Sequence, residues 1–342
     1  MSELFHKLLI LRTSGIGPVK YQGLIKKFGS PVAAAESLKS DQKHSDSVLR
    51  EMDAAAKLGI EYICDDDPRY PQKLLEIKNH PPVLSVRGNT DTLQKPAIGM
   101  VGTRNATAAG MKFISDMACA FAENNYAVVS GMAMGTDTAA AMGALRAGGN
   151  TQTIAVLGGG VDYIWPLENE KLYHYIIERG IVVSEMPVGS VPSPSNFIQR
   201  NRWISGIAES LVLGEADEKS GSMATAEFAL SYGRPVFAIP SHPSDARSIG
   251  PNRLIKEGQA TLCMGVDDFF GSKKSKNNAR DKNISNCQNP QNDVLDKLGI
   301  IPVSESVLTG LVKKSIAEIK RDLIMLELGG KIKKVDTGYI KL

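Results

Sequence analysis

Between residues 66 and 270, short apolar runs alternate with longer segments whose apolar residues recur with a helical period. The runs, rich in Val, Ile and Ala, lie at 97–101, 127–130, 153–157, 181–184, 210–213 and 236–239. The helices expected between them span 108–123, 136–147, 168–178 and 224–232. Short apolar strands that alternate with helices predict a parallel sheet covered on both faces. With right-handed crossovers, this is a Rossmann-like, doubly wound α/β fold.

The segment 1–65 instead has the pattern of short amphipathic helices. Leu4 and Leu8 begin one apolar stripe, and a second stripe ends at Gly29. The Gly-x-Gly turn between them, at Gly15 and Gly17, is typical of a helix-hairpin-helix. We therefore expect a small N-terminal helical domain of the helix-hairpin-helix or SAM-like type. Its turn could present N–H groups to a phosphate, although an ordinary tight turn fits the pattern equally well.

The C-terminal part divides into two segments. Residues 271–292 are polar and basic and cannot bury a core, which predicts a linker. Within 293–342 the apolar pattern returns. It predicts three helices, around 294–298, 303–311 and 316–328, and then two short strands at 331–335 and 338–342. Three helices and a β-hairpin indicate a winged-helix domain.

Composition narrows the possible surroundings and partners of the chain. The formal net charge is only +3, so an anionic partner must meet positive charge that is concentrated locally. The four cysteines lack metal-ligand spacing, which indicates reduced thiols, with Cys119 buried in a helix. No apolar run is long enough to span a membrane, so we expect a soluble, cytoplasmic protein that binds no membrane.

Three loops that follow predicted strands carry candidate binding residues. In an open parallel sheet, ligands bind beyond the carboxyl ends of the strands. The residues concerned are Gly102, Thr103 and Arg104 in the first loop, Ser130 and Gly131 in the second, and Gly158 in the third. Glycine lets a phosphate approach the backbone, and arginine supplies a forked cation. Neither a P-loop nor a complete dinucleotide fingerprint is present, so we expect no nucleotide cofactor and no metal.

Two further segments add cations and an aromatic ring. The first contributes Phe197, Arg200, Asn201 and Arg202, in which arginines pair phosphates and the ring offers a stacking surface worth roughly 1–3 kcal/mol per base. We expect Trp203, which precedes an isoleucine, to be a core residue. The second segment contributes Lys219, Ser220 and Gly221. They open a helix, so that a cation, hydroxyls and a helix N-terminus would face one anion.

Taken together, these segments resemble the DprA (Smf) family of bacterial DNA-processing proteins. The resemblance runs in consistent order through residues 66–270 and is specific, unlike any single glycine pair. The matching stretches are VGTR at 101–104, SGMAMGTD at 130–137, GAL at 143–145, TIAVLG at 153–158, SE at 184–185, NF at 196–197, RNR at 200–202, KSGS at 219–222, Arg234 and GPN at 250–252. The sequence departs from the family pattern at Ala141, Trp165, Trp203 and Ser241.

The resemblance implies a homodimer that binds single-stranded DNA, protects incoming DNA and loads the RecA recombinase onto it during natural transformation. It implies no catalysis and no cofactor. The residues that it implies as phosphate contacts are Arg104, Ser130, Gly131, Arg200, Arg202, Lys219 and Ser220.

Two rival functions belong to other classes. The fold is also similar to that of phosphoribohydrolases, which hydrolyse nucleoside monophosphates, and Glu227 would then be the catalytic carboxylate. The proline and paired glycines of their loop are missing, and Glu227 could equally face solvent. A duplex-binding regulator would use the winged helix. Residues 293–342, however, carry nine Lys and Arg against seven Asp and Glu, which is weakly basic for a duplex reader.

Overall fold

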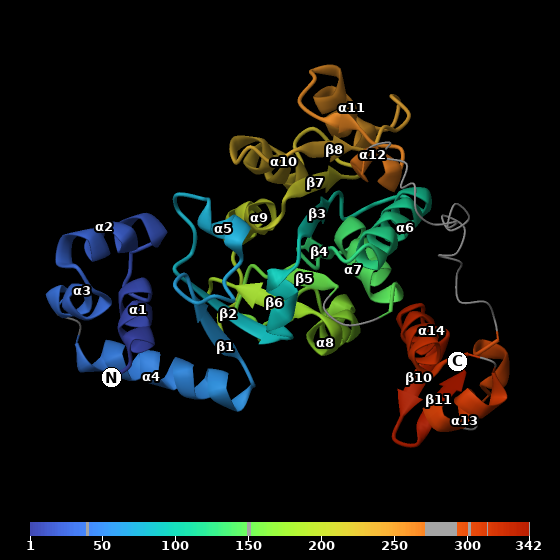
Figure 1. The fold of residues 1–342 in the computed structure, drawn as a ribbon, viewed down its shortest axis with the longest axis horizontal. Helices are drawn as coiled ribbons and strands as arrows, with labels where there is room; N and C mark the ends of the chain where they lie inside the picture. The colour runs from blue at the N-terminus through green and yellow to red at the C-terminus, as the bar shows by residue number, and fades with distance from the viewer. Residues whose placement is uncertain (39–40, 149–151, 271–292, 300–301, 313, 342) are drawn as a thin grey trace.

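The computed structural model describes residues 1–38, 41–148, 152–270, 293–299, 302–312 and 314–341. Its centre is a nine-stranded sheet with the strand order β1-β2-β6-β5-β4-β3-β7-β8-β9 (Figure 1). The strands are β1 (Glu61–Cys64), β2 (Val83–Gly88), β3 (Ala97–Val101), β4 (Ala127–Ser130), β5 (Thr153–Val156), β6 (Ile181–Ser184), β7 (Ser210–Leu213), β8 (Val236–Ala238) and β9 (Thr261–Leu262). Strands β3 to β9 run parallel to one another. The Rossmann-like prediction is confirmed in these strands, with small shifts in where some of them end.

The sheet is not parallel throughout. β1 pairs with β2, and β2 with β6, in antiparallel register. The first of these strands lies inside the segment that the sequence indicates as helical, so residues 61–64 belong to the sheet instead. The sequence pattern hides β1 because its four residues do not alternate. Ile63 is fully buried, while Tyr62 and Cys64 on the other face are covered by the N-terminal helices.

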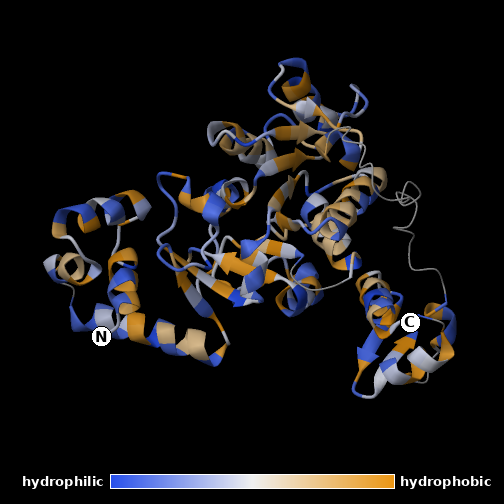
Figure 2. Cartoon of the chain, viewed as in Figure 1, coloured by the Kyte–Doolittle hydropathy of each residue, from blue (hydrophilic) through white to orange (hydrophobic). Residues whose placement is uncertain are grey.

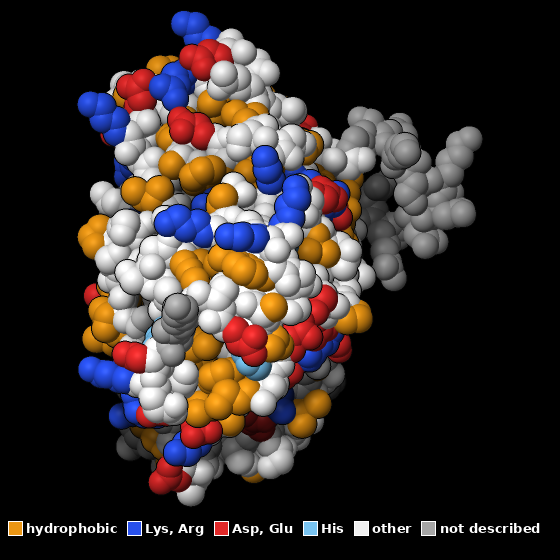
Figure 3. Space-filling model, turned by 90° about the vertical axis from the view of Figure 1, so that its left-hand side faces the viewer, with side chains coloured by type: hydrophobic (Ala, Val, Ile, Leu, Met, Phe, Trp, Pro, Cys, Tyr) orange, Lys and Arg blue, Asp and Glu red, His pale blue; other side chains and the backbone are white. Residues whose placement is uncertain are grey.

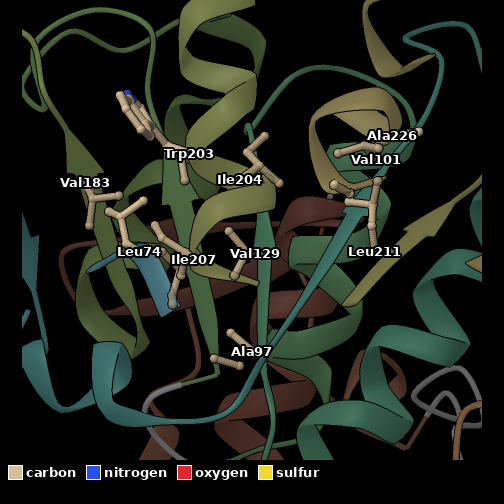
Figure 4. Packing of buried hydrophobic residues seen from close by; sticks show 14 of the residues in the cluster. Leu74, Ala97, Val101, Val129, Val183, Trp203, Ile204, Ile207, Leu211 and Ala226 are labelled. Atoms are coloured by element: carbon tan, nitrogen blue, oxygen red, sulfur yellow. The ribbon is translucent and has the colours of Figure 1, made fainter. Parts of the chain in front are cut away.

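Helices cover both faces of the sheet, and its central strands are strongly hydrophobic (Figure 2). One face carries α6 (Ala108–Glu123), α7 (Thr136–Arg146), α8 (Glu170–Arg179) and α12 (Val266–Phe270). The other carries α5 (Gln72–Leu75), α9 (Pro194–Ile207), α10 (Gly221–Ser231) and α11 (Ile249–Lys256). On this second face, Trp203 and Ile207 of α9 pack toward strand residues that include Val129 and Val183 (Figure 4). The predicted core roles of Trp203 and Cys119 are confirmed, since they are 1% and 2% exposed.

The strand order reverses between β3 and β7. From β3, the chain adds β4, β5 and β6 on one side, and then β7, β8 and β9 on the other. Loops at such a switch point leave in opposite directions and open a crevice at the carboxyl edge of the sheet. The sheet ends at β9, a strand of only two residues, both exposed.

Four helices precede the sheet: α1 (Glu3–Leu11), α2 (Pro18–Phe28), α3 (Pro31–Ser37) and α4 (Gln42–Lys57). The end of α2 is set by Gly29, whose φ of 81° stops the helix in the left-handed region. Their shared core includes Phe5 and Leu8 and extends to Val83 of β2. Figure 3 shows the side of the molecule that carries these helices. Lys and Arg side chains gather in a band across the upper half of this side, with acidic side chains above and below it.

The C-terminal unit, residues 293–341, contains α13 (Glu305–Leu311), α14 (Ile316–Leu328) and a hairpin of β10 (Ile332–Val335) and β11 (Gly338–Lys341). The first helix predicted there is wrong, because only a single 3-10 turn forms at Leu295–Lys297. Val294 and Leu298 still enter the small core of the unit, which explains their apolar spacing. The predicted linker at 271–292 lies outside the described residues.

The C-terminal unit docks on the sheet domain through α14, which lies against α7 and α8 (Figure 1). Leu328 packs with the apolar cluster that contains Tyr173 and Ile176. The Tyr175 hydroxyl donates a hydrogen bond of 2.5 Å to Glu327, and Lys171 lies 3.6 Å from the same carboxylate. Burial and the neighbouring Glu327 raise the pKa of Tyr175, so it remains a donor at neutral pH.

We predict that Tyr175→Phe loosens this docking. Removing a donor to a charged acceptor should cost about 1.5–3 kcal/mol at the interface. Amide hydrogen exchange within α14 should then be faster, while exchange in β3 and β4 stays unchanged. The matched control is Tyr62→Phe, which removes the hydrogen bond from the Tyr62 hydroxyl in β1 to the Glu51 carboxylate in α4. Equal exchange of α14 in both variants would contradict the prediction.

Candidate nucleic-acid interface

The predicted binding segments meet at the carboxyl edge of the sheet, around the switch point. The Ser222 hydroxyl at the start of α10 donates a hydrogen bond of 2.6 Å to the Gly102 carbonyl after β3. The Asn201 amide of α9 donates to the Gly221 carbonyl at 3.1 Å. These two bonds join α10 to the loop after β3 and to α9.

An arginine and two aromatic rings form a cluster at this edge. The Arg104 guanidinium carbon lies 4.9 Å from the ring centroid of Trp165 and 5.7 Å from that of Phe197. The two rings are 4.5 Å apart and tilted by 43°. Arg104 is exposed, and both rings are partly exposed. The cluster therefore offers a cation and apolar ring surface at one place that solvent can reach.

The lack of a side chain at Gly158 makes room for the Phe197 ring. A β-carbon added at Gly158 would lie 3.0 Å from the Phe197 ring, closer than ordinary contact allows. The glycine therefore lets the ring approach the loop after β5. Gly131, in the loop after β4, has even less room for a side chain, because a β-carbon there would collide with the Arg200 guanidinium.

Arg200 is buried rather than open to a ligand. It is only 5% exposed, and one of its terminal nitrogens donates to the carbonyls of Gly131 and Val156, both at 2.5 Å. Its Nε donates to the Asn201 side chain at 3.0 Å. Burial lowers the pKa of Arg200 to about 10, so it is charged at neutral pH. The structure thus places this predicted site residue beneath the loops, where it holds their backbone.

Asp137 holds the same loop from the other side. Its carboxylate accepts from the N–H groups of Gly131 at 3.0 Å and Ala133 at 3.4 Å. Burial raises the pKa of Asp137, while Arg200 and these N–H groups oppose the rise. Between these contacts Met132 has a φ of 56°, a conformation that side chains other than glycine rarely adopt. The loop after β4 is therefore fixed by a buried carboxylate and a buried guanidinium.

Ser130 and Thr103, two other predicted site residues, also make their hydrogen bonds within the protein. The Ser130 side chain is fully buried, and its hydroxyl lies 3.5 Å from the Asp137 carbonyl. Thr103 donates its N–H to the Glu215 carbonyl at 2.6 Å and accepts at its own carbonyl from Thr136. Both residues shape the loops through hydrogen bonds within the protein.

The start of α10 presents a different set of groups. Ser220 is its N-cap residue, and the Ser220 hydroxyl oxygen is buried with no hydrogen-bond partner among the described residues. Lys219 and Gly221 are exposed. A helix N-terminus with a hydroxyl and a lysine beside it suits an anion. The acidic side chains of Asp217 and Glu218 stand next to Lys219, so the local positive charge is moderate.

Arg202 lies apart from the other predicted residues. Its guanidinium stacks 4.1 Å from the centroid of the Trp203 ring and donates to the Asn79 carbonyl at 3.0 Å. It lines a separate cavity on the adjoining face of α9. Arg200 and Arg202 look equivalent in the sequence but point to different sides of the helix.

Sequence analysis missed two residues of this edge. Trp165 was noted only as a departure from the family pattern, yet it stacks with Phe197 and Arg104. Asp137 was noted only within the stretch SGMAMGTD at 130–137, yet it binds the loop after β4 directly. Its place in that stretch was the available signal for Asp137. No local pattern marks Trp165.

A doubly wound sheet with a cation, aromatic rings and a helix N-terminus at its switch point defines an α/β protein of the Rossmann-like class, in which ligand sites lie at this edge of the sheet. The chain belongs to the family described as DNA recombination-mediator protein A, whose model matches residues 61–273.

Relatives and solved structures agree with this assignment. The chain is 40% identical to the DNA processing protein DprA of Streptococcus pneumoniae over 201 residues, which cover 59% of this chain and 70% of that protein. It is 33% identical to Protein Smf of Synechocystis over 79% of this chain and 73% of that protein. The X-ray structure of DprA from Streptococcus pneumoniae superposes with a TM-score of 0.68 at 31% identity, over 79% of this chain and 97% of that one.

A second solved structure, of DNA processing protein A from Helicobacter pylori, superposes with a TM-score of 0.56 at 29% identity. The superposition covers 61% of this chain and 93% of that one, and that structure concerns the single-stranded DNA binding mode of the Helicobacter pylori protein. Within the described part of this chain, no helix is long and apolar enough to cross a bilayer. No group of His, Cys, Asp and Glu in those residues could hold a metal ion.

We predict that Arg200→Met destabilises the fold strongly. The change leaves Asp137 buried without its cation and removes the donor to two buried carbonyls, which should cost about 3–5 kcal/mol. The urea midpoint should fall accordingly. Arg104→Met, at an exposed position, should stay within about 0.5 kcal/mol of the parent protein. Similar midpoints for both variants would show that Arg200 does not hold the loops.

Proposed function

We propose that this protein binds single-stranded DNA along the carboxyl edge of its sheet and has no catalytic activity of its own. The observation that carries the proposal is the partly exposed cluster of Arg104, Trp165 and Phe197. An unpaired base has a free face that can stack on an aromatic ring, whereas a base within a duplex has none. The guanidinium beside the rings can pair with the adjoining phosphate.

Phosphate contacts come from exposed cations and from groups left unpaired at a helix start. Exposed Lys219, the buried and unpartnered Ser220 hydroxyl and the first N–H groups of α10 suit one phosphate, and exposed Arg104 suits another. Gly102 and Gly158 act indirectly, because their missing side chains make room for Thr136 and for the Phe197 ring. Arg200, Ser130 and Gly131 act indirectly in this proposal, because they hold the loops that carry the exposed groups.

The wider role follows from the family. Its description as a recombination mediator supports a role in which the bound strand is protected and passed to the recombinase RecA during natural transformation. The Helicobacter pylori structure, which concerns single-stranded DNA binding, supports the choice of ligand. We propose that the protein acts in the cytoplasm as a homodimer, and that its C-terminal unit is a winged helix with an accessory role.

The hydrolase alternative finds less support. Glu227, its candidate carboxylate, is exposed on α10. It lines neither of two surface cavities, one beside α9 and one beside α6. We therefore assign it no catalytic role.

We predict that single strands bind far more tightly than duplex, with little sequence preference. Ring stacking needs unpaired bases, and the proposed contacts include no element that would read base edges in a groove. A competition experiment with a labelled oligothymidine, challenged by unlabelled single strand or by duplex, measures the difference. Equal competition by the two forms would refute the proposed ligand.

We also predict that Arg104→Ala and Lys219→Ala each weaken binding without unfolding the protein. If each contacts a phosphate, the slope of log affinity against log salt should shrink by roughly 0.7 per variant. Lys57→Ala, at an exposed position in the last turn of α4, is the control and should keep the parent slope. Parent-like affinity and slope in both site variants would remove them from the interface.

A further inference from the structure

A cavity of about 710 Å³ lies between α5, α9 and α10, on the face of α9 next to the cluster of Arg104, Trp165 and Phe197. Its volume falls within the range of pockets that hold small ligands. The proposed single-strand interface does not use it. We call it the α9 groove, and the lining residues that matter below are Lys78, Ile198, Arg202, Phe228, Tyr232 and Arg234.

The groove is lined by three cations, Lys78, Arg202 and Arg234. The Nε atoms of Arg202 and Arg234 are buried and have no hydrogen-bond partner among the described residues. Arg234 is 8% exposed, and its terminal nitrogens bind Glu76 at 2.6 Å and the Lys73 carbonyl at 2.8 Å. Lys78 is exposed at the rim. Glu76 is the only acid among the lining residues, so positive charge is in excess.

The groove also has an apolar wall. The rings of Phe228 and Tyr232 are nearly parallel, with an interplanar angle of 17° and centroids 6.3 Å apart. Ile198 also lines the groove and is 56% exposed. Aromatic and aliphatic surface beside cationic side chains matches the two parts of a nucleotide, a flat base and a phosphate.

The groove adjoins the first interface through α9. Ile198 and Arg202, which line the groove, directly follow Phe197 and Asn201, which belong to the first interface. The two sites therefore lie on adjoining faces of the same helix. A strand that stacks on Phe197 and crosses α9 would arrive at Ile198.

We propose that the α9 groove is a second subsite for single-stranded DNA. It takes a nucleotide of the same strand, with the base against Phe228 and Tyr232 and the phosphate at Arg202 and Lys78. This inference rests on the proposed function, since it needs a strand already bound at Phe197. It assigns to Arg202 a phosphate that is distinct from the one at Arg104.

The test compares strands that reach the groove with strands that do not. Oligothymidines of about 5 and about 20 nucleotides bracket the site sizes typical of such interfaces. Phe228→Ala should weaken binding of the long strand about fivefold to a hundredfold, as expected for one lost stacking contact, and leave the short strand unchanged. Lys78→Ala, at an exposed position that should not affect folding, should reduce the salt slope for the long strand alone by roughly 0.7.

Two controls separate the possible failures. Glu227→Gln, on α10 beside Phe228 but outside the groove, should bind both strands like the parent protein. Arg104→Ala should weaken both strands. Parent-like binding of the long strand by Phe228→Ala and Lys78→Ala, with Arg104→Ala still weakened, would overturn the groove and keep the proposed function. No binding of either strand by the parent protein would overturn both.

Discussion

The backbone of Gly131 is held from two sides by opposite charges, one on each of its flanking peptide groups, and the rest of the binding edge depends on these contacts. Arg200 binds its carbonyl, and Asp137 binds its N–H group. Burying two charges is expensive, and is tolerated only when both are well hydrogen-bonded. Because Arg200 belongs to α9, the same contact fixes that helix against the ends of β4 and β5. Phe197, one turn earlier on α9, is thereby aimed at Trp165 and Arg104.

Local patterns were sufficient to predict the parallel part of the sheet. A strand such as β4 or β6 is apolar at every position because both of its faces are covered, and this leaves a clear mark in the sequence. α9 was missed for the opposite reason. Its stretch from 196 to 202 is polar, and its buried face includes Arg200, so no apolar stripe shows the helix. β1 was missed because a four-residue strand shared between two cores has no distinctive period.

In the candidate site, too, some features could be predicted from the sequence and others could not. The glycines after the strands were predictable, because a close approach of backbone or ring leaves no alternative residue, as at Gly158. The different fates of Arg200 and Arg202 were not. Two positions apart on a helix means roughly opposite directions, and only the fold decides which direction meets buried carbonyls. The part played by Trp165 depends on a contact between distant segments, which periodicity cannot indicate.

The brevity of β9 affects how copies of this protein can meet. An edge strand exposes unpaired N–H and C=O groups, and a long one invites another chain to add a strand. β9 offers only Thr261 and Leu262, so a chain added there would gain very few backbone hydrogen bonds. Aggregation by strand addition is correspondingly disfavoured at that end of the sheet. Any stable association there must come from complementary side chains, which recognise a particular surface where bare backbone would accept almost any chain.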